Sequence, residues 1–412
     1  MKPAQLPMLL GYRVLDFTQF VAGPTSTRIM AELGADVVKV ELGPAGDRTR
    51  ISGLKPRDVA SSQSTYYFQH NHSKRSLAID FKSPQGLALI KAMIPEFDVV
   101  VENFSPGTMT RTGLGYDDLK ALHPGIIMCS ISLGGQNGPL AQKPGYDYIG
   151  QAYSGIADLI GEADGPPSLP GMAIGDFATG IAAAMAIGFA LLHRERTGEG
   201  QHIDASIIDT YFQMHEAAVP RVSLRKSRRP VRTGSQHPDG GPIGIFRCGD
   251  HGYVTIVVLP HQWNSFVGAI GMPGLDEDPR FATPVKRRDH NEDLKAIIEQ
   301  WLGSFDSRAA ALRRLDEFRV PCAPVLTVAE AMDHPHLRGR GTVRRVSDPL
   351  LGEFDIPGPL VRFSAWNQPA DLRADLLGEH NAEVLSDLLG LSAEEIERLH
   401  GDRILVRDPA AA

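Results

Sequence analysis

The sequence predicts an α/β protein with an open, doubly wound parallel sheet and a second, smaller domain. Three observations carry this prediction. Short apolar segments of strand length alternate with amphipathic segments of helix length through the first third of the chain, and glycine or proline separates most of them. The composition, 42% hydrophobic and 22% charged over 412 residues, is that of a globular protein with a sizeable core.

The alternation begins with a β-α-β unit. Arg13–Phe17 and Asp36–Glu41 have the apolar pattern of buried strands, and Thr25–Leu33 between them has the pattern of a helix. Gly23-Pro24 and Gly34 mark the turns. Because a helix connects the two strands, they are expected to lie parallel in one sheet.

The same alternation continues beyond this unit. In order, the expected elements are a helix over Pro84–Glu96, a strand over Asp98–Glu102, a helix over Tyr116–Leu122, a strand over Ile126–Ser132, and helices over Ile181–Leu192 and Asp204–Ala218. Ile181–Leu192 is about a dozen apolar residues, shorter than the ~20 that a membrane span needs. It is therefore expected to be a core helix, with no membrane partner.

A polar stretch rich in Arg, Pro, Gly and Ser, Leu224–Gly241, predicts a domain boundary. The expected organisation is a large domain over 1–223, a linker over 224–243, a small α+β domain over 244–328, and a C-terminal segment over 329–412. The small domain is expected to contain strands at Gly252–Val258 and Ala323–Leu326 and helices at His261–Ile270, Asn291–Phe305 and Ser307–Phe318. Ser392 and Glu395 have the spacing of a capping box at the start of the last helix.

Charge and cysteine usage exclude several classes of protein. A net charge of -7 argues against a protein held on nucleic acid by phosphate contacts. Cys129, Cys248 and Cys322 are widely spaced, so neither a disulfide framework nor a zinc site is expected, and no metal motif such as H-E-x-x-H occurs. The N-terminus lacks the basic and apolar pattern of a secretory leader, and a cytoplasmic protein is expected.

One carboxylate, Asp176, stands in front of an Ala/Gly-rich helical run. It is open to two interpretations. It could be an N-cap that satisfies free backbone N–H groups, or a nucleophile that the helix N-terminus keeps ionised and surrounds with donors. The small residues around it, from Gly175 to Ala184, would suit either tight helix packing or the close approach of a ligand.

The turn Thr18–Pro24 follows the first strand, where open α/β sheets bind ligands. It carries no G-x-G-x-x-G or G-K-[ST] motif, which disfavours ordinary dinucleotide and NTP binding. Cations and backbone amides near other strand ends, at Lys74–Ser76, Asp80–Lys82 and Glu102–Arg111, could hold a phosphorylated ligand or be solvated surface. Gly234–Pro242 could be a mobile lid or an interdomain turn.

Taken together, the chain resembles the class III coenzyme A transferases, the family of formyl-CoA transferase and carnitine CoA-transferase. The resemblance covers nearly the whole chain. It is carried by Gly11–Phe17, Ala22-Gly-Pro24, Leu33–Glu41, Gly46-Asp47, Asn71–Ser76, Val101–Phe104, Gly145–Tyr148, Gly175-Asp-Phe177, Arg196–Gln201 and Gly378-Glu-His380.

The resemblance implies a Rossmann-like large domain built from both chain ends, with 329–412 completing it, and an interlocked homodimer. It also implies that Asp176 is the catalytic nucleophile. Asp176 would form a mixed anhydride with the acyl group of an acyl-CoA and then an aspartyl-CoA thioester, from which a carboxylic acid takes the CoA. No tightly bound cofactor is implied, because coenzyme A enters as a substrate.

By the same resemblance, a set of residues binds CoA: Val21, Ala22, Ile79, Asp80, Phe81, Lys82, Asn103, Phe104, Ser105, Arg111, Lys143 and Tyr146. The substrate loops would contain Gly175, Phe177, Gly240 and Gly241, and the last two could close over the reactive anhydrides. The chain departs from the family at Leu42 and Pro144, where formyl-CoA transferase has cations that contact CoA.

Three other functions are alternatives to CoA transfer: a racemase, a non-catalytic acyl-CoA binding protein and a thioesterase. An α-methylacyl-CoA racemase would use an aspartate and a histidine as bases, but Tyr146 occupies the histidine's place and is a poor base near neutral pH. A non-catalytic acyl-CoA binding protein would not need Asp176. The acceptor acid is not named by the sequence, although Arg221 or Arg232 could bind a second carboxylate.

Overall fold

The computed structural model describes residues 6–53, 55, 63–224, 230–366, 369 and 372–411. It divides into two compact units. The first comprises Met1–Ser154, Met172–Met214 and His336–Ala412, and the second comprises Gly155–Gly171 and His215–Pro335. These limits differ from the expected ones at three places. Gly155–Gly171 joins the second unit, that unit begins again at His215, and it ends at Pro335 and not at 328.

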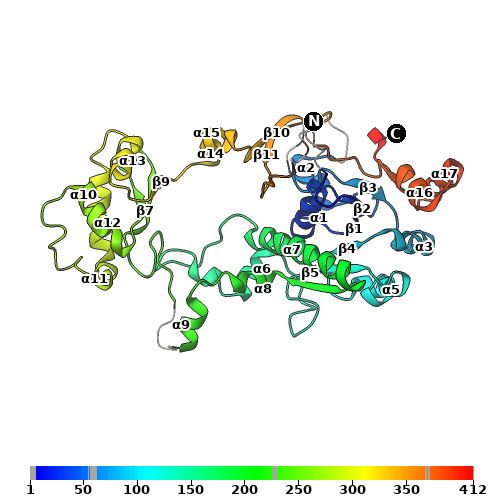
Figure 1. Ribbon diagram of the computed structural model, residues 1–412, viewed down its shortest axis with the longest axis horizontal. Coiled ribbons are helices and arrows are strands. Elements are labelled where there is room, and N and C mark those ends of the chain that lie inside the picture. The colour runs from blue at the N-terminus through cyan, green and yellow to red at the C-terminus, as the bar shows by residue number, and fades with distance from the viewer. Residues whose placement is uncertain are drawn as a thin grey trace. The chain divides into compact units, whose positions relative to one another are not determined.

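The first unit contains a six-stranded sheet of order β3-β2-β1-β4-β5-β6 (Figure 1). Its strands are β1 Arg13–Asp16, β2 Asp36–Glu41, β3 Arg75–Ala78, β4 Val99–Glu102, β5 Ile127–Ser132 and β6 His202–Ser206. Every pair of neighbouring strands is parallel. This is the strand order of Rossmann folds, with the switch point between β1 and β4. The α/β prediction is confirmed.

The sequence pattern missed two strands of this six-stranded sheet, β3 and β6. β3 has only four residues and directly follows a cationic stretch. β6 lies at the sheet edge and alternates polar with apolar residues, so it lacks an apolar run. The predicted helix over Asp204–Ala218 is wrong at both ends, because β6 extends to Ser206 and the helix that follows covers only Ile207–Gln213.

Helices surround the sheet of the first unit. They are α1 Ala22–Glu32, α2 Thr65–Asn71, α3 Pro84–Met93, α4 Thr108–Thr112, α5 Tyr116–Leu122, α6 Asp147–Tyr153, α7 Ile174–Thr197, α8 Ile207–Gln213, α15 Pro335–Gly339, α16 Asn381–Leu389 and α17 Ala393–Gly401, with short 3-10 turns η1 Arg48–Ile51, η2 Ile94–Glu96 and η5 Pro409–Ala411. A hairpin of β10 Val343–Asp348 and β11 Gly352–Pro357 precedes α16. The capping box is confirmed, because Ser392 Oγ accepts from the Glu395 N–H and Glu395 accepts from the Ser392 N–H at 2.8 Å.

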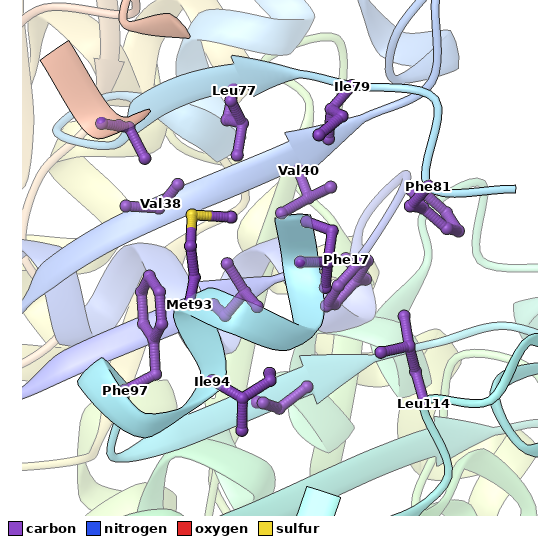
Figure 2. Packing of buried hydrophobic residues seen from close by; sticks show 14 of the residues in the cluster. Phe17, Val38, Val40, Leu77, Ile79, Phe81, Met93, Ile94, Phe97 and Leu114 are labelled. Carbon is purple, nitrogen blue, oxygen red and sulfur yellow. The ribbon is translucent and has the colours of Figure 1, made fainter. Parts of the chain in front are cut away.

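The strands bury both faces, and alternate residues belong to different clusters. Val14 and Val37 pack with α1 and α7, whereas Leu15 and Val38 pack on the other side. Figure 2 shows the second cluster, where side chains of β2 and β3 lie over Met93 and Ile94. Residues of α16 and α17 belong to this same cluster, so the C-terminal segment contributes to the core of the first unit.

Helix α7 packs closely on α1. A Cβ added at Gly180 would stand 2.5 Å from the backbone oxygen of Ala22, so only glycine permits this approach. The small residues of α7 therefore serve helix packing at this point.

Helix α7 is also longer than the apolar segment Ile181–Leu192 expected from the sequence. By length and hydropathy it is the one helix among the described residues that could cross a membrane, although the core helix of a globular domain passes the same test. Its residues Ala183, Ile187, Ala190 and Leu191 are buried in the cluster shared with the sheet. Its other face carries exposed Ile181, Met185, Phe189 and Leu192.

The second unit has its own core around a three-stranded antiparallel sheet of order β7-β8-β9. Its elements are η3 Ala157–Leu159, α9 Ala218–Leu224, β7 Ile243–Arg247, β8 Tyr253–Val257, η4 Pro260–Gln262, α10 Trp263–Ile270, α11 Pro284–Asp289, α12 Asn291–Leu302, α13 Arg308–Glu317, β9 Cys322–Pro324 and α14 Val328–Asp333. The expected strand and helix pattern of this region is thus present, and β7 was not foreseen.

Candidate active site

A cavity of about 400 Å³ opens at the carboxyl ends of β1 and β4. This is the switch point of the sheet, where Rossmann-type folds bind their ligands. The cavity is lined by Gln19, Phe20, Val21, Ala22, Arg48, Asn103, Phe104, Ser105, Pro106, Ile131, Ser132, Leu133, Lys143, Pro144, Gly145, Tyr146, Asp176 and Ile207. All of these residues belong to the first unit.

Asp176 reaches this cavity from the first turn of α7. The helix begins at Ile174, so Asp176 lies inside the helix and is not its N-cap, and the N-cap interpretation is wrong. Over the part of the chain that the structure describes, no hydrogen bond or ion pair holds the Asp176 carboxylate. Its oxygens are available to a substrate.

A second acid, Asp147, fixes the start of α7. One oxygen of its buried carboxylate accepts from the Asp176 N–H at 2.9 Å, and the other accepts from the Tyr211 hydroxyl at 2.8 Å. The Tyr211 ring lies against Gly175, where an added Cβ would stand 2.1 Å from a ring carbon. Gly175 is therefore required by this ring, and the position of Asp176 depends on α6, α7 and α8 together.

Burial, and after it the charge of Asp147, raises the pKa of Asp176 to about 7. The sequence suggested the opposite, a helix N-terminus that keeps the acid ionised. The first-turn donors have other partners, because the Asp176 N–H bonds to Asp147 and the Phe177 N–H bonds to the Ala173 carbonyl. The local helix field is thus outweighed by desolvation and a nearby like charge.

The loop after β1, which carries Val21 and Ala22 to the cavity, is held by buried charges. Asp16 accepts from the Thr18 N–H at 2.8 Å and lies 3.0 Å from Lys74 Nζ. Lys39 Nζ donates to the Thr18 carbonyl at 2.7 Å. Burial opposes ionisation of Asp16, but the two lysines outweigh it and hold the pKa of Asp16 well below its usual range.

The loops after β1 and β4 are joined across the switch point. Asn103 Oδ1 accepts from the Gln19 N–H, and Asn103 Nδ2 donates to the Gln19 carbonyl, both at 2.8 Å. Asn103 therefore orients the cavity wall through its side chain. Phe20, in the left-handed backbone region at φ 65°, places its ring edge-on to Tyr146 with centroids 5.7 Å apart.

The structure brings many of the predicted site residues together around the cavity. Those that line it are Val21, Ala22, Asn103, Phe104, Ser105, Lys143, Tyr146 and Asp176. Those of the first unit that do not line it are Ile79, Asp80, Phe81, Lys82, Arg111, Gly175 and Phe177. The side chains of Ile79 and Phe81 are buried in the core, and Arg111 is exposed on α4, where it donates to Thr108. Gly240 and Gly241 belong to the second unit.

Three residues of or beside the site were not foreseen. Arg48 lines the cavity, Asp147 supports Asp176, and Tyr211 supports Asp147. Asp147 lies inside the motif Gly145–Tyr148 and Arg48 directly follows Gly46-Asp47, so both adjoined motifs that had already been singled out. Nothing in the local sequence links Tyr211 to Gly175.

The fold and the site define a class of protein: an α/β protein with a Rossmann-type sheet that binds its ligand at the switch point and brings a carboxylate into that crevice. The sequence model of CoA-transferase family III matches residues 9–381. The chain belongs to this family and is an enzyme, a class III CoA-transferase.

Named relatives agree with this assignment. The succinyl-CoA–D-citramalate CoA-transferase of Chloroflexus aurantiacus is 34% identical over 394 residues, covering 95% of this chain and 97% of the relative. The formyl-CoA:oxalate CoA-transferase of Rhodopseudomonas palustris is 33% identical over 417 residues, covering 95% of each chain. The crystal structure of a CAIB/BAIF family protein from Brucella suis has a TM-score of 0.81 at 33% identity, covering 92% of this chain and 99% of that one.

Proposed function

We propose that this enzyme moves coenzyme A from an acyl-CoA thioester to a free carboxylic acid through covalent intermediates on Asp176. The observation that carries the proposal is the Asp176 carboxylate, which lines the switch-point cavity and has no bonding partner among the described side chains and backbone groups. The related enzymes are named for CoA exchange between acids, which supports the same reaction class here.

The first half of the reaction loads the enzyme. An oxygen of ionised Asp176 attacks the thioester carbonyl, the C–S bond breaks, and CoA leaves as a thiolate. The thiolate then attacks the aspartyl carbonyl of the mixed anhydride, releasing the donor acid as a carboxylate and leaving an aspartyl-CoA thioester. The second half repeats these steps in reverse with the acceptor acid and restores the Asp176 carboxylate.

The environment of Asp176 suits a nucleophile. A carboxylate with a pKa of about 7 is largely ionised just above neutral pH and is more basic, and hence more nucleophilic, than an ordinary aspartate. Its backbone is fixed by Asp147, so attack requires little reorganisation. Closure of Gly240 and Gly241 over the anhydrides stays a prediction, and its purpose would be to exclude water.

Tyr146 in the cavity supports transfer over racemisation. A racemase needs a second base for the α-proton, and a phenol is ordinarily protonated near neutral pH. Among the described residues that line the cavity there is no histidine.

We further propose that the enzyme works as an interlocked homodimer. The exposed apolar residues Ile181, Met185, Phe189 and Leu192 follow one face of α7, and such a stripe is a typical protein contact surface. Light scattering should then give twice the 44.7 kDa chain mass. Met185→Glu with Phe189→Glu should lower the yield of folded dimer, whereas Leu122→Glu, at an exposed apolar residue of α5, should not.

The reaction is tested by mass spectrometry. Purified enzyme is incubated with a panel of acyl-CoA donors and carboxylic acids, CoA ester exchange is followed, and hydroxylamine traps any Asp176 adduct. Asp176→Asn should abolish both exchange and adduct. Asp209→Asn is the matched control, because Asp209 is an exposed acid in the first turn of α8 and lies outside the cavity lining.

The outcomes separate the possible functions. Exchange with a trapped Asp176 supports the transferase. Loss of an α-hydrogen label without exchange would indicate a racemase, hydrolysis without an acceptor would indicate a thioesterase, and CoA binding without either would indicate a binding protein.

A further inference from the structure

Arg48 is a cation of the cavity for which the described residues provide no partner. It is exposed at the start of η1, lines the same cavity as Asp176, and makes no ion pair or side-chain hydrogen bond with any residue of the described segments. By contrast, Arg50, two residues later, is buried against Glu41 with a 2.7 Å contact. An unpaired guanidinium in the same cavity as the Asp176 carboxylate can recognise a second anion.

The acid next to Arg48 does not neutralise it. The carboxylate of Asp47 is buried, lies 3.0 Å from Lys39 Nζ, and accepts from the Thr49 N–H at 2.9 Å. Asp47 therefore does not pair with Arg48, and the charge of Arg48 remains available to a ligand in the cavity.

The backbone that carries Arg48 is fixed. The Asp47 N–H donates to Glu41 at 2.9 Å, and Ser64 Oγ donates to the Thr49 carbonyl at 2.6 Å. Both neighbours of Arg48 are thus anchored in the buried network, and only its side chain has freedom. Such a support preorganises a binding group.

Arg48 and Asp176 line one cavity. The cavity therefore presents a guanidinium and the Asp176 carboxylate to the same bound ligand.

The cations that the sequence offered for a second carboxylate are already occupied. Arg221 contacts Asp239 at 2.9 Å, and Arg232 contacts Asp158 at 2.8 Å, both within the second unit. Neither lines the cavity. Arg48, by contrast, is an arginine that does line the cavity.

From these observations we infer that Arg48 binds the distal carboxylate of a dicarboxylic acid, whose other carboxylate reacts at Asp176. The inference rests on the proposed transfer reaction and names its substrate class. The charges are consistent: when Asp176 is converted to its uncharged thioester, Arg48 and Lys143 remain as two cations in the lining, facing an acceptor with two negative charges. A planar guanidinium matches a carboxylate by two parallel hydrogen bonds.

The test compares acids in matched pairs. Oxalate, malonate, succinate and glutarate are each measured against the monocarboxylate of the same carbon number, using the donor that best loads Asp176. For at least one pair, kcat/KM should favour the dicarboxylate in the wild type, and Arg48→Met should reduce that preference by about 10- to 100-fold. Lys143→Met, at the second cation of the lining, should lower exchange for both members of a pair together and leave the preference as it was.

A binding measurement keeps the inference separate from the reaction. Titration calorimetry on Asp176→Asn should show tighter binding of the preferred dicarboxylate than of its monocarboxylate partner, and Arg48→Met in that background should remove the difference. A wild type without any such preference, or an Arg48→Met enzyme that retains it, overturns the inference. An equal rise in KM for the CoA donor with both acids would instead assign Arg48 to a phosphate of CoA. If wild-type enzyme shows no exchange and no adduct, the proposed function fails, while the calorimetric comparison still decides the role of Arg48.

Discussion

The carboxylate of Asp147 accepts a hydrogen bond from the backbone N–H of Asp176 at 2.9 Å. This one contact does two things. It orients the residue that we propose as the nucleophile, and it brings a second negative charge close to it. Together with burial, that charge raises the pKa of Asp176 to about 7, so position and basicity have a shared cause.

The first prediction concerns the pH dependence of exchange. Since Asp176 must be ionised to attack, kcat/KM for the donor should fall tenfold per pH unit below about 7 and reach a plateau above it. Asp147→Asn keeps an oxygen that accepts from the Asp176 N–H but removes the negative charge. The acidic limb of the pH-rate profile should therefore shift to lower pH by roughly one pH unit. Pre-steady-state acylation from pH 5 to 9 measures this, and Tyr211→Phe, which leaves the Asp147 charge in place, should leave the limb near pH 7. A limb that stays at the same pH in Asp147→Asn would contradict the assigned cause.

The second prediction is a gain in stability when the nucleophile is neutralised. The pKa of Asp176 is raised from 3.8 to about 7 in the folded protein, so between these values the native state binds a proton that the unfolded state does not. The free energy of unfolding must then fall as pH rises through this window. Asp176→Asn has no such pH-dependent loss. Its free energy of unfolding should therefore exceed that of the wild type by at least ~1 kcal/mol at pH 8 and by little at pH 4.

Urea unfolding of both proteins at several pH values checks this second prediction. The control is Asp209→Asn, at an exposed acid in the same helical setting, and its difference from the wild type should not grow with pH. If the free energy of unfolding depends on pH in the same way in Asp176→Asn and the wild type, burial of the Asp176 carboxylate does not destabilise the folded protein.

The third prediction tests the contact between Gly175 and Tyr211. A methyl group at Gly175 would meet the Tyr211 ring at 2.1 Å, so Gly175→Ala must displace the ring and with it the support of Asp147. We expect a loss of about 1–3 kcal/mol in stability together with a lower kcat. Gly401→Ala at the end of α17 is the control, since its Cβ would meet nothing within 4 Å and alanine favours the helix by up to ~1 kcal/mol. If Gly175→Ala and Gly401→Ala have the same thermal stability and the same exchange rate, the contact between Gly175 and the Tyr211 ring does not contribute to function.

The fold was predictable where the periodicity was strong. The apolar strands β1, β2, β4 and β5 and the helix Tyr116–Leu122 were anticipated within a residue or two, because both faces of a parallel sheet are covered and its strands read as apolar runs. The edge strand β6 was not, since an edge strand exposes one side and loses that run. Local pattern cannot reveal which polar segment will complete a sheet.

Site residues could be predicted where they lie within or next to the sequence motifs that carry the family resemblance. Asp176 and Tyr146 were placed in the site by family resemblance, and both line the cavity. The raised pKa of Asp176 was not foreseen, because it depends on Asp147, which is 29 residues away in sequence. Arg48 was missed for a similar reason. It has no partner among the described residues, and only the three-dimensional arrangement of Asp47, Lys39 and Glu41 shows this.

The fourth prediction addresses the buried pair beneath the cavity loop. Lys74 and Asp16 are fully buried and 3.0 Å apart, and Asp16 also accepts from the hydroxyls of Thr18 and Thr27 at 2.5 and 2.7 Å. Lys74→Met leaves the carboxylate without its closest cation, so stability should fall by about 3–5 kcal/mol. The loop that carries Val21 and Ala22 should loosen at the same time, and KM for the acyl-CoA should rise more than kcat falls.

A double-mutant cycle separates pairing from packing in this fourth case. If the cost of Lys74→Met is that of an uncompensated charge, Asp16→Asn combined with Lys74→Met should lose less than the sum of the two single losses, because the remaining neutral amide can still accept from Thr18. Chemical unfolding of the four proteins gives the coupling energy, and acylation kinetics on those that fold give the effect on KM. Additive losses would show that the two side chains act only by filling space, and would remove the electrostatic explanation for the position of the loop.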